Sequence, residues 1–388
     1  MSSGPLSGIR VVELGVWVAG PGAGGLLAEW GADVIKVEPP TGDPMRHLFQ
    51  LTAGHGQPEV PPFDLDNRGK RSVVLDLRTP DGRDAMQRLV ATADVFLTNL
   101  RPEAVERLGL GAADLLGAND TLVYAQITGF GSTGPDADRP GYDVGAFWAR
   151  TGMARSFTPD DEPPANIRAG MGDHMTAMTL VAAINAAMVE RTRTGRGQLV
   201  DTSLLRTGIW SVGWDLGIQL RFGKMAPTVP RTETMNPMVN PYQAGDGGWF
   251  WLLGLESDRH WPALARAVGH EEWLTDEPFA TGRGRRKHAA AVIAAMDGAF
   301  AERPRAEWFE RFDAEGVWFA PVHSPADVVV DPQAIAAGAF VDVPGGEDGP
   351  AHRAVASPVD FGGRQTEPAG AVPALGEHTA EVLAELER

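Results

Sequence analysis

The chain has 388 residues, 43% hydrophobic and 22% charged, which is ordinary for a soluble globular protein with room for two domains. Its net charge of −17 argues against a nucleic-acid surface, and the absence of cysteine excludes disulfides, a thiol nucleophile and thiolate metal sites. No apolar run reaches the ~20 residues that span a bilayer, and a signal peptide's basic and apolar regions are absent from the N-terminus. We therefore expect a cytoplasmic protein with no nucleic-acid or membrane partner. Nine histidines without His-x-x-x-His spacing predict no metal site.

Strands and helices alternate through residues 1–222. The first strand is expected at 9–14, followed by a helix at 21–30 and a second strand at 34–38. Thr79 and Pro80 predict the cap and first residue of another helix. Further strands are expected at 72–77, 94–98, 122–127 and 198–202, with a helix at 175–190 before the last. This alternation predicts an α/β fold with a doubly wound, mainly parallel sheet.

The pattern changes after about Phe222. Residues 224–240 have no clear period and predict a linker or an active-site loop. A hairpin at 242–253, helices at 260–268, 287–301 and 305–315, and a short strand at 317–322 predict a smaller α+β domain. A Gly/Pro-rich tail begins at Pro332, and a last helix is expected at 378–386. The predicted boundaries are therefore 1–222, 223–330 and 331–388.

The glycine run from Gly20 to Gly25 matches the dinucleotide pattern G-x-G-x-x-G, and Glu38 ends the next predicted strand, where a ribose-binding acid is expected. However, Gly15–Ala19 intervene between the first strand and Gly20, whereas the fingerprint places its first glycine directly after the strand. The alternative is a helix whose small residues permit close packing. An NAD-dependent oxidoreductase therefore stays open as a rival function.

The stretch from Ala169 to His174 places Asp173 between two glycines and the start of a helix. One interpretation is an N-cap, because an Asp oxygen can accept a hydrogen bond from a first-turn N–H. The other is a carboxylate nucleophile, because Gly170 and Gly172 leave room for a large ligand and the helix dipole favours the ionised form. This stretch alone does not decide between the two interpretations.

Motifs in a fixed order along nearly the whole chain identify a family resemblance. They are Leu6–Leu14, Ala19–Pro21, Gly31–Glu38, Asn67–Ser72, Leu75–Leu77, Ala93–Val95, Asn99–Pro102, Gly141–Asp143, Gly172–Asp173, Gly316–Val322 and Pro373–Thr379. In these stretches the chain resembles the class III coenzyme A transferases, the family of formyl-CoA transferase and the carnitine and bile-acid CoA-transferases. The resemblance implies a large Rossmann-like domain that the C-terminal segment rejoins, a smaller domain between long linkers, and an interlocked homodimer.

The resemblance also implies a reaction. Asp173 occupies the place of the family's nucleophile, which attacks the thioester of a donor acyl-CoA. CoA then passes through an aspartyl thioester to an acceptor carboxylic acid. Acyl-CoA and a small carboxylic acid are thus the expected partners, CoA is a substrate, and no permanently bound cofactor is expected.

Further roles follow from matching positions. The expected CoA contacts are Val18, Ala19, Lys70, Arg71, Asn99, Leu100, Arg101 and Arg107, the four basic residues serving its phosphates. Trp17, Tyr142 and Gly254 are expected at the acyl pocket and its lid. Val18 stands where formyl-CoA transferase has glutamine, which disfavours a formyl or oxalyl substrate.

Two other functions stay open beside transfer and oxidoreduction. Alpha-methylacyl-CoA racemases resemble the same family, but they have a His-Asp pair where this chain has Tyr142-Asp143. The ordinary pKa of tyrosine, about 10, is poorly matched to proton abstraction at neutral pH. His174 is the alternative base, but on a helix its ring is expected to point away from the side chain of Asp173. A non-catalytic acyl-CoA-binding protein is the remaining alternative.

Overall fold

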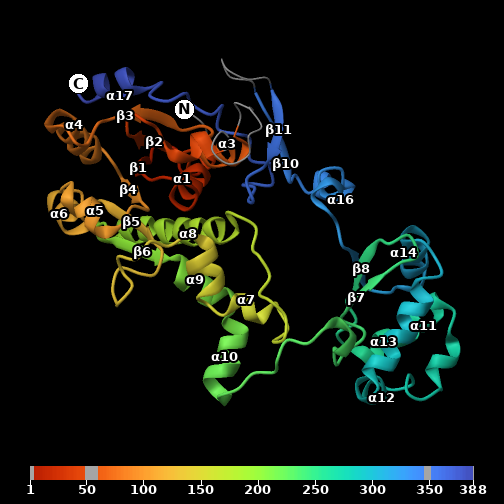
Figure 1. The fold of residues 1–388 in the computed structure, drawn as a ribbon. Coiled ribbons are helices and arrows are strands. Elements are labelled where there is room, and N and C mark those ends of the chain that lie inside the picture. Colours follow the sequence, from red (N-terminus) through yellow and green to blue (C-terminus); the bar gives the residue numbers. More distant parts are fainter. Residues whose placement is uncertain (1–3, 49–59, 345–350, 388) are drawn as a thin grey trace. The chain divides into compact units, whose positions relative to one another are not determined.

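The computed structural model describes residues 4–48, 60–344 and 351–387 (Figure 1). Contacts divide the chain into two units. Unit 1 contains Met1–Ala154, Ala165–Met225 and Ala336–Arg388, and unit 2 contains Arg155–Pro164 and Ala226–Ile335. The boundaries expected from the sequence lie near residues 222 and 330, and the short segment Arg155–Pro164 was not expected in the second unit. Within the described ranges, no helix combines the length and apolar character that crossing a bilayer requires.

Unit 1 contains a six-stranded sheet in which every neighbouring pair is parallel, so the predicted parallel sheet is confirmed. Its strands are β1 (Arg10–Leu14), β2 (Asp33–Glu38), β3 (Arg71–Val74), β4 (Val95–Thr98), β5 (Val123–Thr128) and β6 (Leu199–Ser203). The strand order is β3-β2-β1-β4-β5-β6. This order reverses between β1 and β4, where open α/β sheets bind ligands beyond the carboxyl ends of their strands.

Helices cover both faces of this sheet because both faces of its strands are apolar. The helices of unit 1 are α1 (Ala19–Glu29), α3 (Pro61–Asn67), α4 (Pro80–Ala91), α5 (Pro102–Arg107), α6 (Ala112–Ala118), α8 (Met171–Thr194), α9 (Leu204–Ser211), α10 (Gly213–Phe222) and α17 (Thr379–Glu385). Val11 and Val34 pack in one core with α1 and α8, and Val12 and Ile35 pack in the other with α4 and α17. This alternation follows the two-residue period of a strand. The predicted cap is confirmed, since Thr79 Oγ1 accepts a hydrogen bond from the Gly82 N–H at 3.1 Å.

Short elements complete unit 1. They are the 3₁₀ turn η1 (Pro44–His47), the π-helix η2 (Asp143–Ala149), and the antiparallel strands β10 (Phe340–Val343) and β11 (His352–Val355). The helix α7 (Met153–Ser156) spans the first crossing between the units. The strands β10 and β11 were not expected from the sequence, because each has only four residues and lies in the Gly/Pro-rich tail.

Unit 2 has its own core under a three-stranded antiparallel sheet, as the predicted smaller α+β domain requires. Its strands are β7 (Pro241–Gln243), β8 (Trp249–Leu252) and β9 (Phe319–Pro321), and β7 and β8 form the predicted hairpin. Its helical elements are η3 (Arg231–Glu233), α11 (Ser257–Val268), η4 (Glu271–Leu274), α12 (Gly282–Lys287), α13 (Ala289–Phe300), α14 (Arg305–Glu315) and α15 (Pro325–Val328), with α16 (Pro332–Ala336) at the second crossing. Phe250, Phe300 and Phe312 meet at its centre.

Candidate active site

Asp173 lies in the first turn of α8. The helix begins at Met171, directly after Gly170, whose left-handed backbone (φ 83°) makes the turn into it. Asp173 is thus the third residue of the helix, and the capping position belongs to Gly170, which has no side chain. The N-cap interpretation of Asp173 is therefore wrong.

The first turn of α8 is fixed against η2. The buried Asp143 carboxylate accepts hydrogen bonds from the N–H groups of Gly170 and Val144, both at 2.8 Å. Gly172 permits the close approach, since a Cβ at this position would lie 2.5 Å from Cγ of Phe147. The position of Asp173 is thus set by an aspartate and a glycine that bind and pack beside it.

The Asp173 carboxyl group is half-buried and accepts no hydrogen bond from any residue in the described ranges. Burial is the largest cause that raises the pKa of Asp173 to about 7, and the carboxylates of Asp143 and Asp66 act in the same direction, against the opposing charge of His174. The sequence analysis expected the helix dipole to favour the ionised form, but burial and like charges outweigh it here. The carboxylate is therefore unpaired and destabilised, and both properties suit a nucleophile.

The loop between β1 and α1 is clamped by Asn99, which directly follows β4. Its Oδ1 accepts a hydrogen bond from the Val16 N–H at 3.0 Å, and its Nδ2 donates to the Val16 carbonyl at 2.7 Å. Gly20 makes room for this amide, because a Cβ there would lie 2.9 Å from Cγ of Asn99. The amide of Asn99, a predicted CoA contact, is thus engaged in holding the loop.

Trp17 is the one non-glycine residue with a positive φ (66°) in the described part of the chain. Its N–H donates to Asp43 Oδ1 at 3.1 Å, which helps to hold this unfavourable backbone conformation. Its ring meets that of Tyr142 edge to face, with centroids 6.3 Å apart, and Tyr142 is 61% exposed. The fold thus brings together two predicted pocket residues that are far apart in sequence.

Three other predicted CoA contacts, Val18, Ala19 and Leu100, lie at different places near these rings and are buried to different degrees. Val18 lies beside the approach to Asp173, since its Cγ1 is 3.8 Å from where a Cβ of Gly170 would stand. Ala19 begins α1 and is buried. Leu100 is half-buried after β4, and its N–H donates to Thr98 Oγ1 at 3.1 Å.

The glycine run lies inside α1 and not in the turn after β1. A Cβ at Gly22 would lie 3.3 Å from both the Asp66 Oδ1 and the His174 ring, and one at Gly25 would lie 2.6 Å from the Asp66 carbonyl. These glycines therefore allow α1 to pack against α3 and α8, as the packing alternative expects. Glu38, the candidate ribose ligand, instead accepts hydrogen bonds from Arg46 and Ser72.

Lys70 is buried inside unit 1. Its Nζ donates to Glu13 Oε2 at 2.7 Å, to the Pro21 carbonyl at 2.8 Å and to Asn67 Oδ1 at 3.0 Å, which uses all three of its protons. Burial lowers the pKa of Lys70 to about 8 despite the adjacent carboxylate. This position disfavours the prediction that Lys70 contacts a CoA phosphate.

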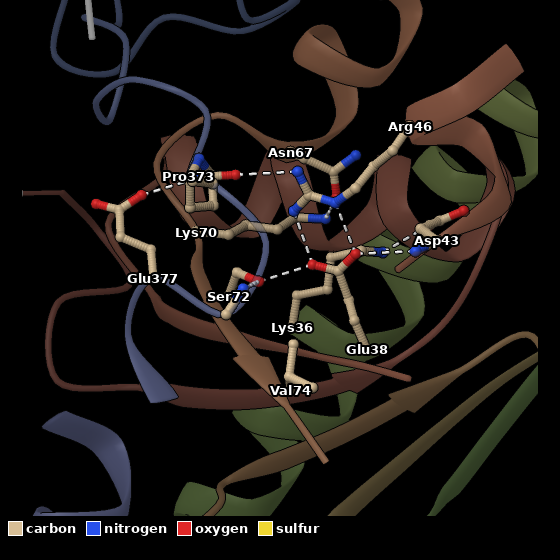
Figure 2. Close-up of polar contacts among 12 residues, drawn as sticks. Lys36, Glu38, Asp43, Arg46, Asn67, Lys70, Ser72, Val74, Pro373 and Glu377 are labelled. Carbon is tan, nitrogen blue, oxygen red and sulfur yellow. Dashed lines mark hydrogen bonds and ion pairs between the residues drawn. The ribbon is translucent and has the colours of Figure 1, made fainter. Parts of the chain in front are cut away.

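The same interior network includes Lys36 and Asp43 (Figure 2). Lys36 pairs with Glu13 at 3.0 Å and with Asp43 at 2.9 Å, and Asp43 in turn holds the Trp17 N–H. Figure 2 also shows Arg46 bound to Glu38 and to the carbonyl of Pro373 in the C-terminal segment. The buried charges therefore form a scaffold beneath the candidate site.

The other predicted phosphate ligands are divided between the amino ends and the carboxyl ends of the strands. Arg71 opens β3 and pairs with Asp33 at the start of β2 and with Glu385 of α17, both at the amino ends of the strands. Arg101 is exposed at the start of α5, just beyond the carboxyl end of β4. Arg107 is exposed on the same helix, 3.6 Å from Glu103. Arg101 and Arg107 therefore lie nearer the strand ends that bind ligands in this architecture.

Gly254 belongs to unit 2, where its N–H donates to the Met238 carbonyl at 2.7 Å. A Cβ there would lie 2.6 Å from the Met238 Cε, so the absence of a side chain serves local packing. In the described ranges, no three acidic or histidine side chains come together as metal ligands would.

His174 and Asp66 form a pair that the sequence analysis did not find. His174 Nε2 lies 2.9 Å from Oδ1 of the buried Asp66, which is in the last turn of α3 and directly precedes the Asn67–Ser72 motif. The sequence analysis expected the His174 ring to point away from Asp173, and the ring does turn toward α3. The only sequence signals are the position of Asp66 beside that motif and of His174 beside Asp173.

A family model described as CoA-transferase family III matches residues 6–379. The (R)-2-hydroxy-4-methylpentanoate CoA-transferase of Clostridioides difficile is 30% identical over 384 residues, covering 98% of this chain and 95% of that protein. The succinate–glutarate CoA-transferase of Agrobacterium fabrum is 35% identical over 392 residues, covering 99% and 96%. The crystal structure of a CaiB/BaiF family protein from Brucella suis is similar with a TM-score of 0.88 and 32% identity, covering 99% of this chain and 100% of that one.

Proposed function

Because the chain belongs to CoA-transferase family III, we propose that it moves CoA from an acyl-CoA donor to an acceptor carboxylic acid through a covalent intermediate on Asp173. The observation that carries this proposal is the unpaired, half-buried Asp173 carboxyl group at the start of α8. Gly170, which precedes the helix and carries no side chain, leaves space beside it for the large substrate.

The proposed steps balance without an external reactant. An Asp173 oxygen attacks the thioester carbon, the C–S bond breaks, and the electron pair leaves on sulfur as the CoA thiolate. The thiolate attacks Cγ of Asp173, and the anhydride C–O bond breaks to release the donor carboxylate. The acceptor carboxylate then attacks the aspartyl thioester, and the same steps in reverse return Asp173 and a new acyl-CoA. Covalent storage keeps the thioester energy from being lost to water.

The proposed CoA contacts lie around the point where the strand order reverses. Val18, Ala19 and Leu100 flank this point, and Arg101 and Arg107 are the basic side chains that remain accessible near it. We assign Lys70, Arg71 and Asn99 to the scaffold, because their side chains are engaged within the chain. CoA is a substrate in this proposal, and no permanently bound cofactor takes part.

The proposed acyl pocket is apolar. Trp17 and Tyr142 meet edge to face, and Val18 lies beside the Gly170 turn. Aromatic and branched side chains around a reacting carboxylate favour an apolar acyl group over a formyl or oxalyl group. The donor and acceptor acids are therefore to be sought among apolar acids.

We further propose that the protein is an interlocked homodimer. The helix α10 has no buried residue, yet Trp214, Leu220 and Phe222 are 84%, 87% and 71% exposed, and the adjacent Trp210 is 85% exposed. Several large apolar side chains exposed on one short stretch of a single chain indicate a protein interface. Trp214→Glu should shift the protein from dimer to monomer or aggregate in sedimentation, whereas an unchanged dimer would contradict this assignment.

The nucleophile is tested by incubating the protein with a panel of acyl-CoAs, followed by intact-protein and peptide mass spectrometry. An acyl or CoA adduct is expected on Asp173, and Asp173→Asn should lose the adduct and the turnover while still binding CoA. Near-normal turnover of that variant would refute the mechanism.

Incubating a chiral 2-methylacyl-CoA in deuterated water, without an acceptor acid, tests racemisation. Rapid deuterium uptake at the α carbon would replace transfer by proton abstraction.

A further inference from the structure

The pair formed by His174 and Asp66 lies beside the candidate nucleophile. Asp66 is 3% exposed at the end of α3, whereas the side chain of His174 is 44% exposed and reaches solvent on its other side. Gly22 of α1 makes room for both groups, and a Cβ on Gly170 would lie 3.9 Å from the His174 Cε1. The ring is thus anchored at Nε2, and Nδ1 has no hydrogen-bond partner among the described residues.

The buried Asp66 carboxylate is stabilised by a positively charged partner. Oδ2 of Asp66 is buried and has no hydrogen-bond partner in the described ranges, so the His174 bond is the main compensation for its burial. The hydrogen bond to Asp66 raises the pKa of His174, burial opposes this, and the charges of Asp66, Asp173 and Asp143 raise it further. The imidazolium form is therefore favoured beside three carboxyl groups, while Lys70 lies beyond Asp66 and binds Glu13.

We propose that His174 is a catalytic residue that uses Nδ1–H to stabilise the CoA thiolate and the departing carboxylate, and that Asp66 is the positioning residue that holds its ring. This inference rests on the proposed Asp173 chemistry. A fixed cation suits that chemistry because each step releases an anion next to Asp173.

No proton moves in this role. When the C–S bond breaks, the electron pair leaves on sulfur, and the imidazolium donates a hydrogen bond to the thiolate without protonating it. The sulfur therefore stays nucleophilic for its attack on Cγ of Asp173. When the anhydride C–O bond breaks, the same N–H group is available to the carboxylate that forms. A neutral imidazole in its place would supply no compensating charge.

The experiment measures adduct formation on Asp173 in a single turnover, by rapid quenching and mass spectrometry. His174→Gln should slow it about 100-fold, in the range of losing one preorganised donor to a developing anion. The control is His270→Gln in unit 2, because His270 also binds a carboxylate, Glu272, at 2.7 Å, and this change should leave the rate unaltered.

A pH profile separates this role from a merely structural one. Activity should fall as pH rises through the His174 pKa, because the imidazolium is then lost. Asp66→Asn keeps the shape of the side chain but removes its charge, which lowers the His174 pKa and moves this alkaline limb to lower pH. The Asp66→Asn measurement also covers the case in which His174→Gln fails to fold.

Wild-type rates in both variants, with an unmoved alkaline limb, would overturn this inference alone. A wild-type protein that forms no adduct on Asp173 would overturn the proposed function and the inference together. Slower adduct formation in His174→Gln, with a shifted limb in Asp66→Asn, would support both residues in the stated roles.

Discussion

Replacing Asp173 by asparagine should stabilise the fold at alkaline pH while removing activity. Burial raises the pKa of this carboxyl group from 3.8 to about 7, with the charges of Asp143 and Asp66 acting in the same direction. The ionised carboxylate is therefore a cost to the folded state. Asparagine has nearly the same shape and no charge, so it removes the cost and leaves the packing of α8 in place.

The size and sign of the effect follow from linkage. Because the folded pKa lies above the unfolded one, the folded state binds the proton more tightly, and stability falls as pH rises from about 4 to about 7. Each pKa unit corresponds to about 1.4 kcal/mol, so the ionised Asp173 lowers the free energy of unfolding by at most about 4 kcal/mol above pH 7. Solvent screening of the half-buried group reduces this to about 1–2 kcal/mol. Below pH 4 the two proteins should be equally stable.

The assay is differential scanning calorimetry at one protein concentration, at pH 4 and pH 8. At pH 8, Asp173→Asn should melt about 2–5 °C above the wild type, and the difference should vanish at pH 4. Asp138→Asn is the matched control, because Asp138 is exposed in the same unit and its replacement should change neither melt. An Asp173→Asn variant that is less stable than the wild type at pH 8 would refute the reasoning.

Three other predictions concern the same unit. Turnover should rise with pH up to about 7 and fall about tenfold per unit below it, because Asp173 must be ionised to attack; a flat profile in initial-rate assays would contradict this. Gly172→Ala should destabilise the fold by about 1–3 kcal/mol in urea titrations and impair turnover, since its Cβ would meet the Phe147 ring, whereas Gly145→Ala has open space and should be neutral. Burial opposes ionisation of Glu38, yet its basic partners hold its pKa at about 2. The resulting stability is present above pH 4.5 and is lost as pH falls toward 2, so Glu38→Gln should destabilise the fold at pH 7, and acid melts should converge near pH 2.

Local patterns in the sequence determined most of the helices and strands and their order along the chain. The strands β1, β2, β4 and β5 are short, rich in apolar and β-branched residues, and bounded by turn residues, so they follow from the sequence alone. The Thr79 cap is equally local, because donor and acceptor are three residues apart. The helix α8 began earlier than predicted, because Gly170 makes the turn and the apolar period gives no sign of it.

The sequence also determined which residues stand at motif positions, but not what their side chains contact. Lys70 and Arg71 are adjacent basic residues in one motif, and both read as phosphate ligands. In the tertiary structure Lys70 donates a hydrogen bond to Glu13, and Arg71 donates one to Glu385. These partners lie 57 and 314 residues away in the sequence. No local pattern carries information over such separations, because the partners are set by strand order and by the return of the C-terminal segment.

The same reason applies to the candidate site. Trp17 contacts Tyr142, and Asp66 contacts His174, only because the segments that follow different strands all begin at the carboxyl ends of one parallel sheet. The sequence by itself determined that Asp173 stands between glycines and a helix. Only the tertiary structure decided that its carboxyl group is unpaired and bordered by two other carboxylates and a histidine, since burial and like-charge proximity are properties of packed elements and not of neighbouring residues in the chain.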